Sequence, residues 1–155
     1  MKTQQQWFDE YAISHQNATN KIIHYICVPA IFLSIIGLLM CLPSRIIRDL
    51  FPITNPIVEN WGFIAVFFAL FFYSKLSMKT GILMAIFSVF CLALNFLIST
   101  HFSLFYFSII IFIIAWIGQF YGHKIEGKKP SFLKDLQFLL IGPAWVMANV
   151  FENQK

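Results

Sequence analysis

The chain is 155 residues long, and 59% of its residues are hydrophobic whereas only 12% are charged. Soluble globular domains carry about 25% charged residues, so this composition excludes an ordinary soluble domain and indicates an integral membrane protein. The net charge of +4 does not indicate a nucleic-acid partner, because no recognition motif accompanies the basic residues, which lie where anionic lipid headgroups would be. The length predicts a single domain over residues 1–155.

The first twenty residues, MKTQQQWFDEYAISHQNATN, are polar and contain no signal-peptide core. The apolar run that follows, residues 22–42, is long enough to cross the bilayer as a helix, and we expect it to stay in the mature protein. Asn17 and Asn20 precede this run, and one interpretation of both is as N-caps of the helix. The three cysteines lie in apolar runs without Cys-x-x-Cys spacing, which predicts neither disulfides nor a zinc site.

Three further runs are long enough to span the membrane, and they cover residues 61–78, 80–100 and 102–121. Residues 43–60 hold three of the six prolines, which predicts an ordered loop or a short interfacial helix. The segment 132–151 is apolar but interrupted by charges and by Gly142-Pro143, so we expect it to lie in the interface or to be a partial span. The predicted fold is all-α: an integral membrane four-helix bundle with a C-terminal interfacial or half-inserted helical segment.

Lysines and arginines near the ends of the spans predict the orientation, because such residues are retained on the cytoplasmic side of a membrane. With four spans, both termini lie on one face, which holds nine of the eleven basic residues, whereas the opposite face holds Arg45 and Arg48. We therefore expect a multi-pass protein with both termini in the cytoplasm, in the inner membrane of a bacterium or the endoplasmic reticulum of a eukaryote. The four tryptophans are typical of interface anchors; they are Trp7, Trp61, Trp116 and Trp145.

This orientation separates the four histidines. His15, His24 and His123 lie on the cytoplasmic face, whereas His101 falls on the opposite face as a bystander. Three imidazoles at one level of a bundle form a candidate metal site, and Glu126, three residues after His123, could add an oxygen ligand. The alternatives are that the histidines are interfacial residues with their polar tips in water, and that Glu126 forms a surface ion pair with neighbouring lysines.

The residues alone leave the metal and the class of protein open. Imidazoles with at most one carboxylate suit zinc, iron or copper. Four histidines are too few for the membrane di-iron hydroxylases, whose centre resembles a cluster of many histidines, so a mononuclear site is the simpler interpretation. A zinc-dependent membrane hydrolase is one alternative, although its usual His-Glu-x-x-His motif is absent. A non-catalytic lipid-binding or scaffold protein is the other.

Two blocks of the chain resemble the signature blocks of a small multi-pass membrane family. They are YAISHQNATNKIIHYICVPAIF, residues 11–32, and WIGQFYGHKIEGKKPSFLKDLQFLLIGPAWV, residues 116–146, about a third of the chain together. That family includes fungal endoplasmic-reticulum Fe(II)-dependent 2-hydroxy fatty acid dioxygenases. The chain departs from the family pattern in two places: Glu126 follows His123 by three positions instead of four, and Pro-Ser-Phe at 130–132 replaces Pro-Ala-Leu.

The resemblance implies an oxidoreductase of lipid metabolism, a non-haem iron dioxygenase that uses O2 to shorten a 2-hydroxy fatty acid by one carbon through alpha-oxidation. The acyl tail of such a substrate belongs in the lipid bilayer and its oxygen-bearing head at the membrane surface. The resemblance implies His15, His24 and His123 as the ligands of Fe(II), with Glu126 as a further ligand or an outer-shell catalytic base.

The same resemblance implies which residues bind the substrate. Asn20 and Gln119 belong to the two signature blocks, and a lysine close to them, Lys21 or Lys129, would hold the carboxylate. Acyl chain length and oligomeric state follow neither from the residues nor from the resemblance.

Overall fold

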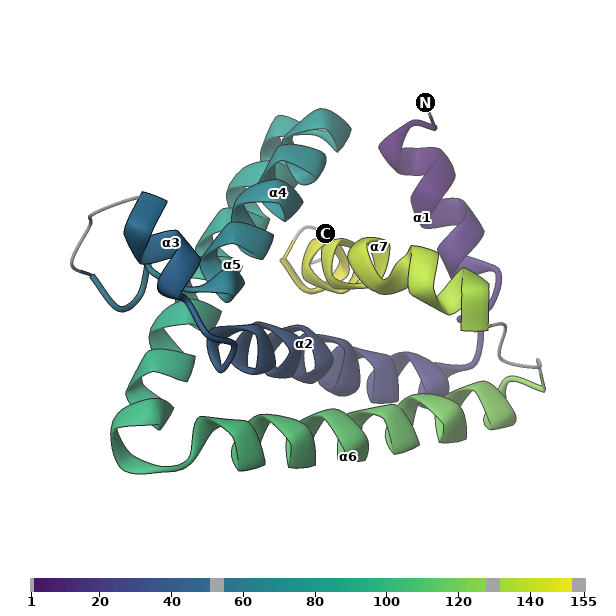
Figure 1. Ribbon diagram of the computed structural model, residues 1–155. Coiled ribbons are helices and arrows are strands. Elements are labelled where there is room, and N and C mark those ends of the chain that lie inside the picture. Colours follow the sequence, from purple (N-terminus) through teal and green to yellow (C-terminus); the bar gives the residue numbers. More distant parts are fainter. Residues whose placement is uncertain (1, 51–54, 128–131, 152–155) are drawn as a thin grey trace.

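The computed structural model describes residues 2–50, 55–127 and 132–151, with side chains omitted at 50 and 132–137, and in these residues it contains helices and no strand (Figure 1). In chain order the helices are α1 (Gln4–Ala12), α2 (Ala18–Met40), α3 (Arg45–Leu50), α4 (Trp61–Leu76), α5 (Met78–His101), α6 (Leu104–Ile125) and α7 (Phe132–Phe151). The predicted all-helical class is confirmed for this part of the chain.

Three of the helices, α2, α5 and α6, are long and apolar enough to cross a membrane. The run predicted as the second span forms α4, which has 16 residues and at 1.5 Å per residue reaches about 24 Å, less than the roughly 30 Å of a hydrocarbon core. The predicted four-helix bundle is therefore not confirmed. The membrane class itself agrees with the three long apolar helices.

The ends of α2 and α6 differ from the predicted spans in ways that matter for the site. α2 begins at Ala18, four residues before the apolar run, because the side chain of Asn17 accepts hydrogen bonds from the first turn. Asn20, the other predicted cap, lies inside the helix and is fully buried. α6 continues past residue 121 to Ile125, so His123 is part of the helix.

α2 and α6 pack side by side and run in opposite directions (Figure 1). Glycines allow the close approach: a Cβ on Gly37 would lie 2.2 Å from Ser108 Oγ, and one on Gly122 would lie 2.4 Å from Asn20 Oδ1. Small residues are the usual means of packing membrane helices, because lipid tails are as apolar as leucine and provide no hydrophobic drive. This contact sets the start of α2 beside the end of α6.

α4 and α5 form a hairpin joined at Ser77 and are inclined to the α2–α6 pair (Figure 1). The tip of this hairpin reaches α1, where Thr80 Oγ1 donates a 2.9 Å hydrogen bond to Gln4 Oε1. α3, the short helix expected in the proline-rich stretch, lies near the C-terminal end of α2.

α7 packs against α1, α2 and α5, so its residues 141–146 are buried by protein. Trp145, predicted as an interface anchor, is only 6% exposed and belongs to a core cluster with Tyr11 and Val28. The hydroxyl of Tyr73 donates to the carbonyl of Leu140 at 2.8 Å and ties α7 to α4. How deeply residues 132–151 enter a bilayer stays a prediction.

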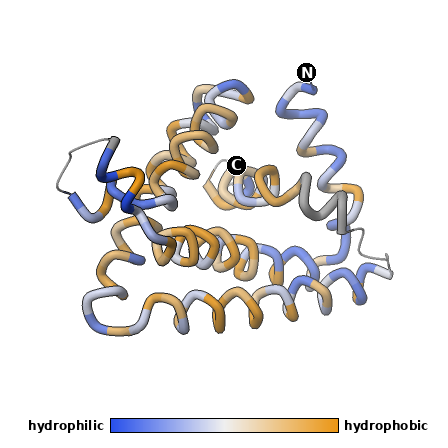
Figure 2. The backbone as a smooth tube through the Cα atoms, in the orientation of Figure 1, coloured by the Kyte–Doolittle hydropathy of each residue, from blue (hydrophilic) through white to orange (hydrophobic). Residues whose placement is uncertain are grey.

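Hydrophilic residues gather on α1, at the start of α2 and at the end of α6, whereas the bodies of α2, α4, α5 and α6 are hydrophobic (Figure 2). Many large apolar side chains on α4, α5 and α6 are exposed, including Phe67, Ile86 and Ile113, as expected for surfaces that face lipid. The start of α2 and the end of α6 together form the polar end of the α2–α6 pair. The hydrophilic surface meets the hydrophobic surface at this end.

Candidate metal centre

Three different elements each present a histidine at the polar end of the α2–α6 pair. His15 lies in the linker between α1 and α2, His24 lies in the second turn of α2, and His123 lies in the last turn of α6. The linker is short and Asn17 caps α2, so the chain reverses and sets His15 against α2. The antiparallel packing of α2 and α6 then brings His123 to the same place.

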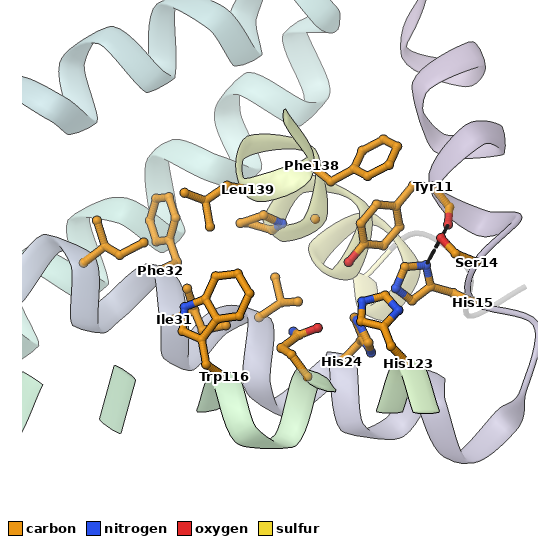
Figure 3. Close-up of a pocket in the computed structure, with 15 residues that line it drawn as sticks. Tyr11, Ser14, His15, His24, Ile31, Phe32, Trp116, His123, Phe138 and Leu139 are labelled. Carbon is orange, nitrogen blue, oxygen red and sulfur yellow. Dashed lines mark hydrogen bonds between the residues drawn. The ribbon is translucent and has the colours of Figure 1, made fainter. Parts of the chain in front are cut away.

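The three imidazoles form one buried group (Figure 3). The ring centroids are 4.2 Å apart for His15 and His24, 5.1 Å for His24 and His123, and 5.6 Å for His15 and His123. One nitrogen of each ring lies within 4.8 Å of the others. The exposed fractions are 2%, 1% and 8% in chain order, so these side chains are not interfacial residues with their tips in water.

Backbone carbonyls select the tautomer of two of the rings. Nδ1 of His15 donates to the carbonyl of Tyr11 at 2.6 Å, and Nδ1 of His24 donates to the carbonyl of Asn20 at 3.0 Å. A nitrogen that donates carries the proton, so the lone pair of each neutral ring is on Nε2. Histidines that bind metals are oriented by such a hydrogen bond from the other ring nitrogen. Both rings are therefore arranged as ligands through Nε2.

A set of imidazole donors fits zinc, iron or copper, and does not fit magnesium or calcium, which prefer oxygen. The group of potential ligands found in the described residues consists of His15, His24 and His123 and does not include Glu126. The three histidines could hold a metal ion.

Glu126 is the C-cap residue of α6, and both of its oxygens accept hydrogen bonds from the α1–α2 region. Oε1 accepts from the N–H of Gln16 at 2.8 Å; Oε2 accepts from the N–H of Asn17 at 3.0 Å and from the side chain of Asn20 at 2.9 Å. Burial raises the pKa of Glu126, but these hydrogen bonds outweigh it and hold that pKa below the ordinary value for glutamate. The carboxylate thus joins the end of α6 to the linker that carries His15.

Asn20 lies between this carboxylate and the histidines. Besides Glu126, its side-chain nitrogen donates to the carbonyl of Ser14 at 3.2 Å, and its own carbonyl accepts from His24. The absent side chain of Gly122 leaves the space for the amide of Asn20. Asn20 thereby contacts the linker, α2 and α6 at once.

The histidines form one end of a cavity that continues between α2, α6 and α7 (Figure 3). Along α2 its wall follows one helix face from His24 to Ile35, a rise of about 16 Å, through His24, Val28, Ile31, Phe32 and Ile35. The cavity volume is about 60 Å³, room for a few water molecules. This space is large enough for a small polar group and too small for a long apolar chain.

A protein-family model described as "2-hydroxy-palmitic acid dioxygenase Mpo1-like" matches residues 1–154. The chain belongs to the Mpo1-like family. Comparison with curated proteins and with solved structures gives no significant match. The resemblance of the two signature blocks is thereby confirmed and extends over almost the entire chain.

The fold brings most of the residues implied by the family resemblance to one place. Gln119 lines the cavity one turn before His123, and Asn20 lies behind the histidines as described. Lys21 is half-buried and is not among the described residues that line the cavity. Lys129 lies outside the described residues. His101 is exposed at the end of α5, far from the histidine group.

Several residues around the histidine group were not predicted as site residues. Tyr11 stacks on His15 with ring centroids 4.0 Å apart and an interplanar angle of 10°. The ring centroids of Trp145 and His15 are 5.7 Å apart. Trp116, predicted as an interface anchor, lines the cavity. The spacing of Tyr11, one helical turn before His15 in the same signature block, is the signal that could have revealed it.

Proposed function

We propose that this protein is a Fe(II)-dependent dioxygenase that removes one carbon from 2-hydroxy fatty acids by alpha-oxidation. The observation that carries the proposal is a buried group of three histidines at one end of a cavity whose other walls are mostly apolar, in a chain of the Mpo1-like family. A 2-hydroxy fatty acid has the two matching parts, a head with oxygens that can chelate a metal and a long apolar tail.

His15, His24 and His123 would hold the iron. Bound ferrous iron would supply the redox chemistry that O2 requires, because three protein ligands leave coordination positions open. The carbonyls of Tyr11 and Asn20 keep the rings of His15 and His24 in the ligating tautomer. Overall, one O2 and one 2-hydroxy acid would give the acid one carbon shorter, one CO2 and one water, which balances both atoms and electrons.

The cavity walls would orient the substrate. The amide of Gln119 lies one helical turn from His123 and can hydrogen-bond the polar head. Val28 and Ile31 continue the wall as apolar side chains, which would exclude water from the head and direct the tail toward the bilayer. This orientation would place the carbon to be released at the histidine end of the cavity.

Glu126 and Asn20 would act through the protein and not by touching the substrate. The hydrogen bonds of the Glu126 carboxylate to the linker and to Asn20 support a role in keeping the three histidines at fixed positions relative to one another. Lys21 and Lys129 remain proposals for a cation near the carboxylate of the substrate. Lys21 is not among the described residues that line the cavity, and Lys129 lies outside the described residues.

A substrate panel tests the proposed reaction. Protein purified without oxygen should contain stoichiometric iron and should consume O2 when given a 2-hydroxy fatty acid, releasing the acid one carbon shorter. The unhydroxylated acid of the same length should give no uptake, because it lacks the 2-hydroxyl group that would chelate the metal together with the carboxylate. Oxygen electrode traces and mass spectrometry of the products measure this. Zinc in place of iron, or protein that binds no metal, would instead support the hydrolase or the non-catalytic alternative.

We also propose that both termini are cytoplasmic. In support, α1 and the end of α6 with Lys124 lie at the opposite end of the α2–α6 pair from α3, which holds both arginines (Figure 1). Lys79 at the start of α5 adjoins Thr80, which contacts Gln4 of α1. In a chain without native cysteines, single cysteines at positions 2 and 128 should react with a membrane-impermeant thiol reagent from the cytoplasm, and one at position 48 only from the opposite side. Labelling of position 48 from the cytoplasm would contradict this orientation.

A further inference from the structure

The three histidines are buried by protein, so iron held by them would be out of contact with a reductant dissolved in water. The proposed reaction needs no external electron, because the 2-hydroxy acid supplies all the electrons that reduce O2. Iron that lost one electron to O2 in the absence of substrate would nevertheless stay ferric until an electron arrived from outside. That electron has to cross the protein around the histidines.

Two easily oxidised side chains contact the ring of His15. Tyr11 stacks on it, with ring centroids 4.0 Å apart and an interplanar angle of 10° (Figure 3). The ring centroid of Trp145 lies 5.7 Å from that of His15 and 5.1 Å from that of Tyr11. Electron transfer between side chains slows steeply with distance, so rings in contact provide the fastest route to and from the histidine group.

The ring contacts continue from Trp145 on α7 to Tyr25 on α2. The two ring centroids are 5.9 Å apart, with an interplanar angle of 34°. Tyr11 and Trp145 are buried, whereas Tyr25 is half-buried and is therefore partly exposed at the surface. These three residues, named here the aromatic path, connect a buried candidate metal ligand with the outside of the protein.

The residue types in the aromatic path favour electron transfer over packing alone. The chain contains 19 phenylalanines but only 5 tyrosines and 4 tryptophans, so phenylalanine is its usual aromatic residue for filling space. The contact between Phe32 and Phe87, with ring centroids 5.3 Å apart, is an example from the core. A phenylalanine ring packs in the same way but does not give up an electron, whereas indole and phenol rings do. All three positions of the path hold an oxidisable ring.

We infer that the aromatic path carries electrons from a one-electron reductant at the surface to ferric iron held by the histidines, and so restores the ferrous state. This inference rests on the proposed function, because it takes iron as the metal. It goes beyond that function because the path serves iron that has been oxidised without substrate, and productive turnover does not use it.

Each transfer along the path balances. The indole of Trp145 gives one electron toward His15, directly or across the stacked ring of Tyr11. Tyr25 then returns one electron to the indole and releases its phenol proton to water. The reductant finally returns one electron to Tyr25, which takes its proton back from water. The reductant has then lost one electron, the iron has gained one, and the path residues are unchanged.

The test compares Trp145→Phe and Tyr25→Phe with wild type, because phenylalanine keeps an aromatic ring at each position but cannot be oxidised. The control is Trp61→Phe, which changes a tryptophan whose indole donates to the carbonyl of Pro43, beyond the C-terminal end of α2. Each iron-loaded protein is exposed to O2 without substrate until it is ferric and is then mixed with ascorbate. Electron paramagnetic resonance follows the loss of the ferric signal, and iron content is measured in parallel.

Trp145→Phe and Tyr25→Phe should keep their iron but should be reduced at least about 10-fold more slowly than wild type. The double variant should be little slower than the slower single variant, because both changes interrupt one path. Trp61→Phe should match wild type. Starting from ferrous protein, Tyr25→Phe should also consume O2 with a 2-hydroxy fatty acid at the wild-type initial rate.

Unchanged reduction of Tyr25→Phe by ascorbate would overturn the inference, since the electron would then reach the iron by another route. Equal slowing in Trp61→Phe, or a loss of initial oxygen uptake in Tyr25→Phe that matches its slower reduction, would overturn it as well by showing a structural effect. If Trp145→Phe fails to fold or to hold iron, Tyr25→Phe decides. Wild-type protein that holds no iron, or that holds iron but consumes no O2 with a 2-hydroxy fatty acid, would overturn the proposed function itself.

Discussion

Replacing His15, His24 or His123 with alanine is expected to abolish stoichiometric iron and with it the oxygen uptake. The structure provides these three histidines as its group of potential ligands in the described residues, and loss of one donor from so small a set removes much of the affinity for a metal. The cavity lining offers no described carboxylate or thiol as a replacement. Metal analysis of each purified variant, together with its thermal unfolding, measures the effect.

The control for these variants is His101→Ala. His101 is exposed at the end of α5, at the other end of α6 from His123, and about 19 residues of helix, or 28 Å, separate the two ends. We expect this variant to retain full iron and full activity. A folded His101→Ala protein without iron, or a folded His24→Ala protein with normal iron, would contradict the assignment of the site.

Glu126→Gln is expected to keep iron under saturating conditions but to weaken its affinity, or the turnover, by about 10-fold to 100-fold, as is typical for partners of metal ligands. The wild-type carboxylate accepts three N–H donors with its two oxygens. A glutamine has one carbonyl oxygen, so its NH2 group must face at least one of those donors. The linker that carries His15 should then shift away from α6. Iron titration and initial rates measure both effects.

A matched control is Glu10→Gln, which changes a glutamate that pairs with Lys2 at the surface of α1. Isolated surface ion pairs contribute about 0–1 kcal/mol, so this change should leave iron affinity unaltered. Complete loss of iron from Glu126→Gln, like that expected of the histidine variants, would make Glu126 a metal ligand after all. Full activity with normal iron affinity would return it to the role of an ordinary surface residue.

The grouping of the histidines could be predicted because it depends on topology alone. Residues at the start of one membrane helix and at the end of an antiparallel one lie at the same end of the protein, whatever the packing details. His24 and His123 satisfy this condition, and the structure brings them together with His15. The partners of Glu126 could not be predicted in this way, because Gln16 and Asn17 are 110 and 109 residues distant in the chain and meet it only through the close contact of α2 and α6.

The sequence by itself determined the membrane class, the apolar helices and the family signature, because these depend on composition, run length and local spacing. Tertiary structure decided that α4 is short, that α7 is packed among other helices, and that Tyr11 and Trp145 surround His15. Hydropathy measures the transfer of a side chain out of water, and the value is the same whether lipid or protein receives it. Apolar runs therefore predict helices that avoid water, and only the packing of those helices decides which of their residues face the metal site.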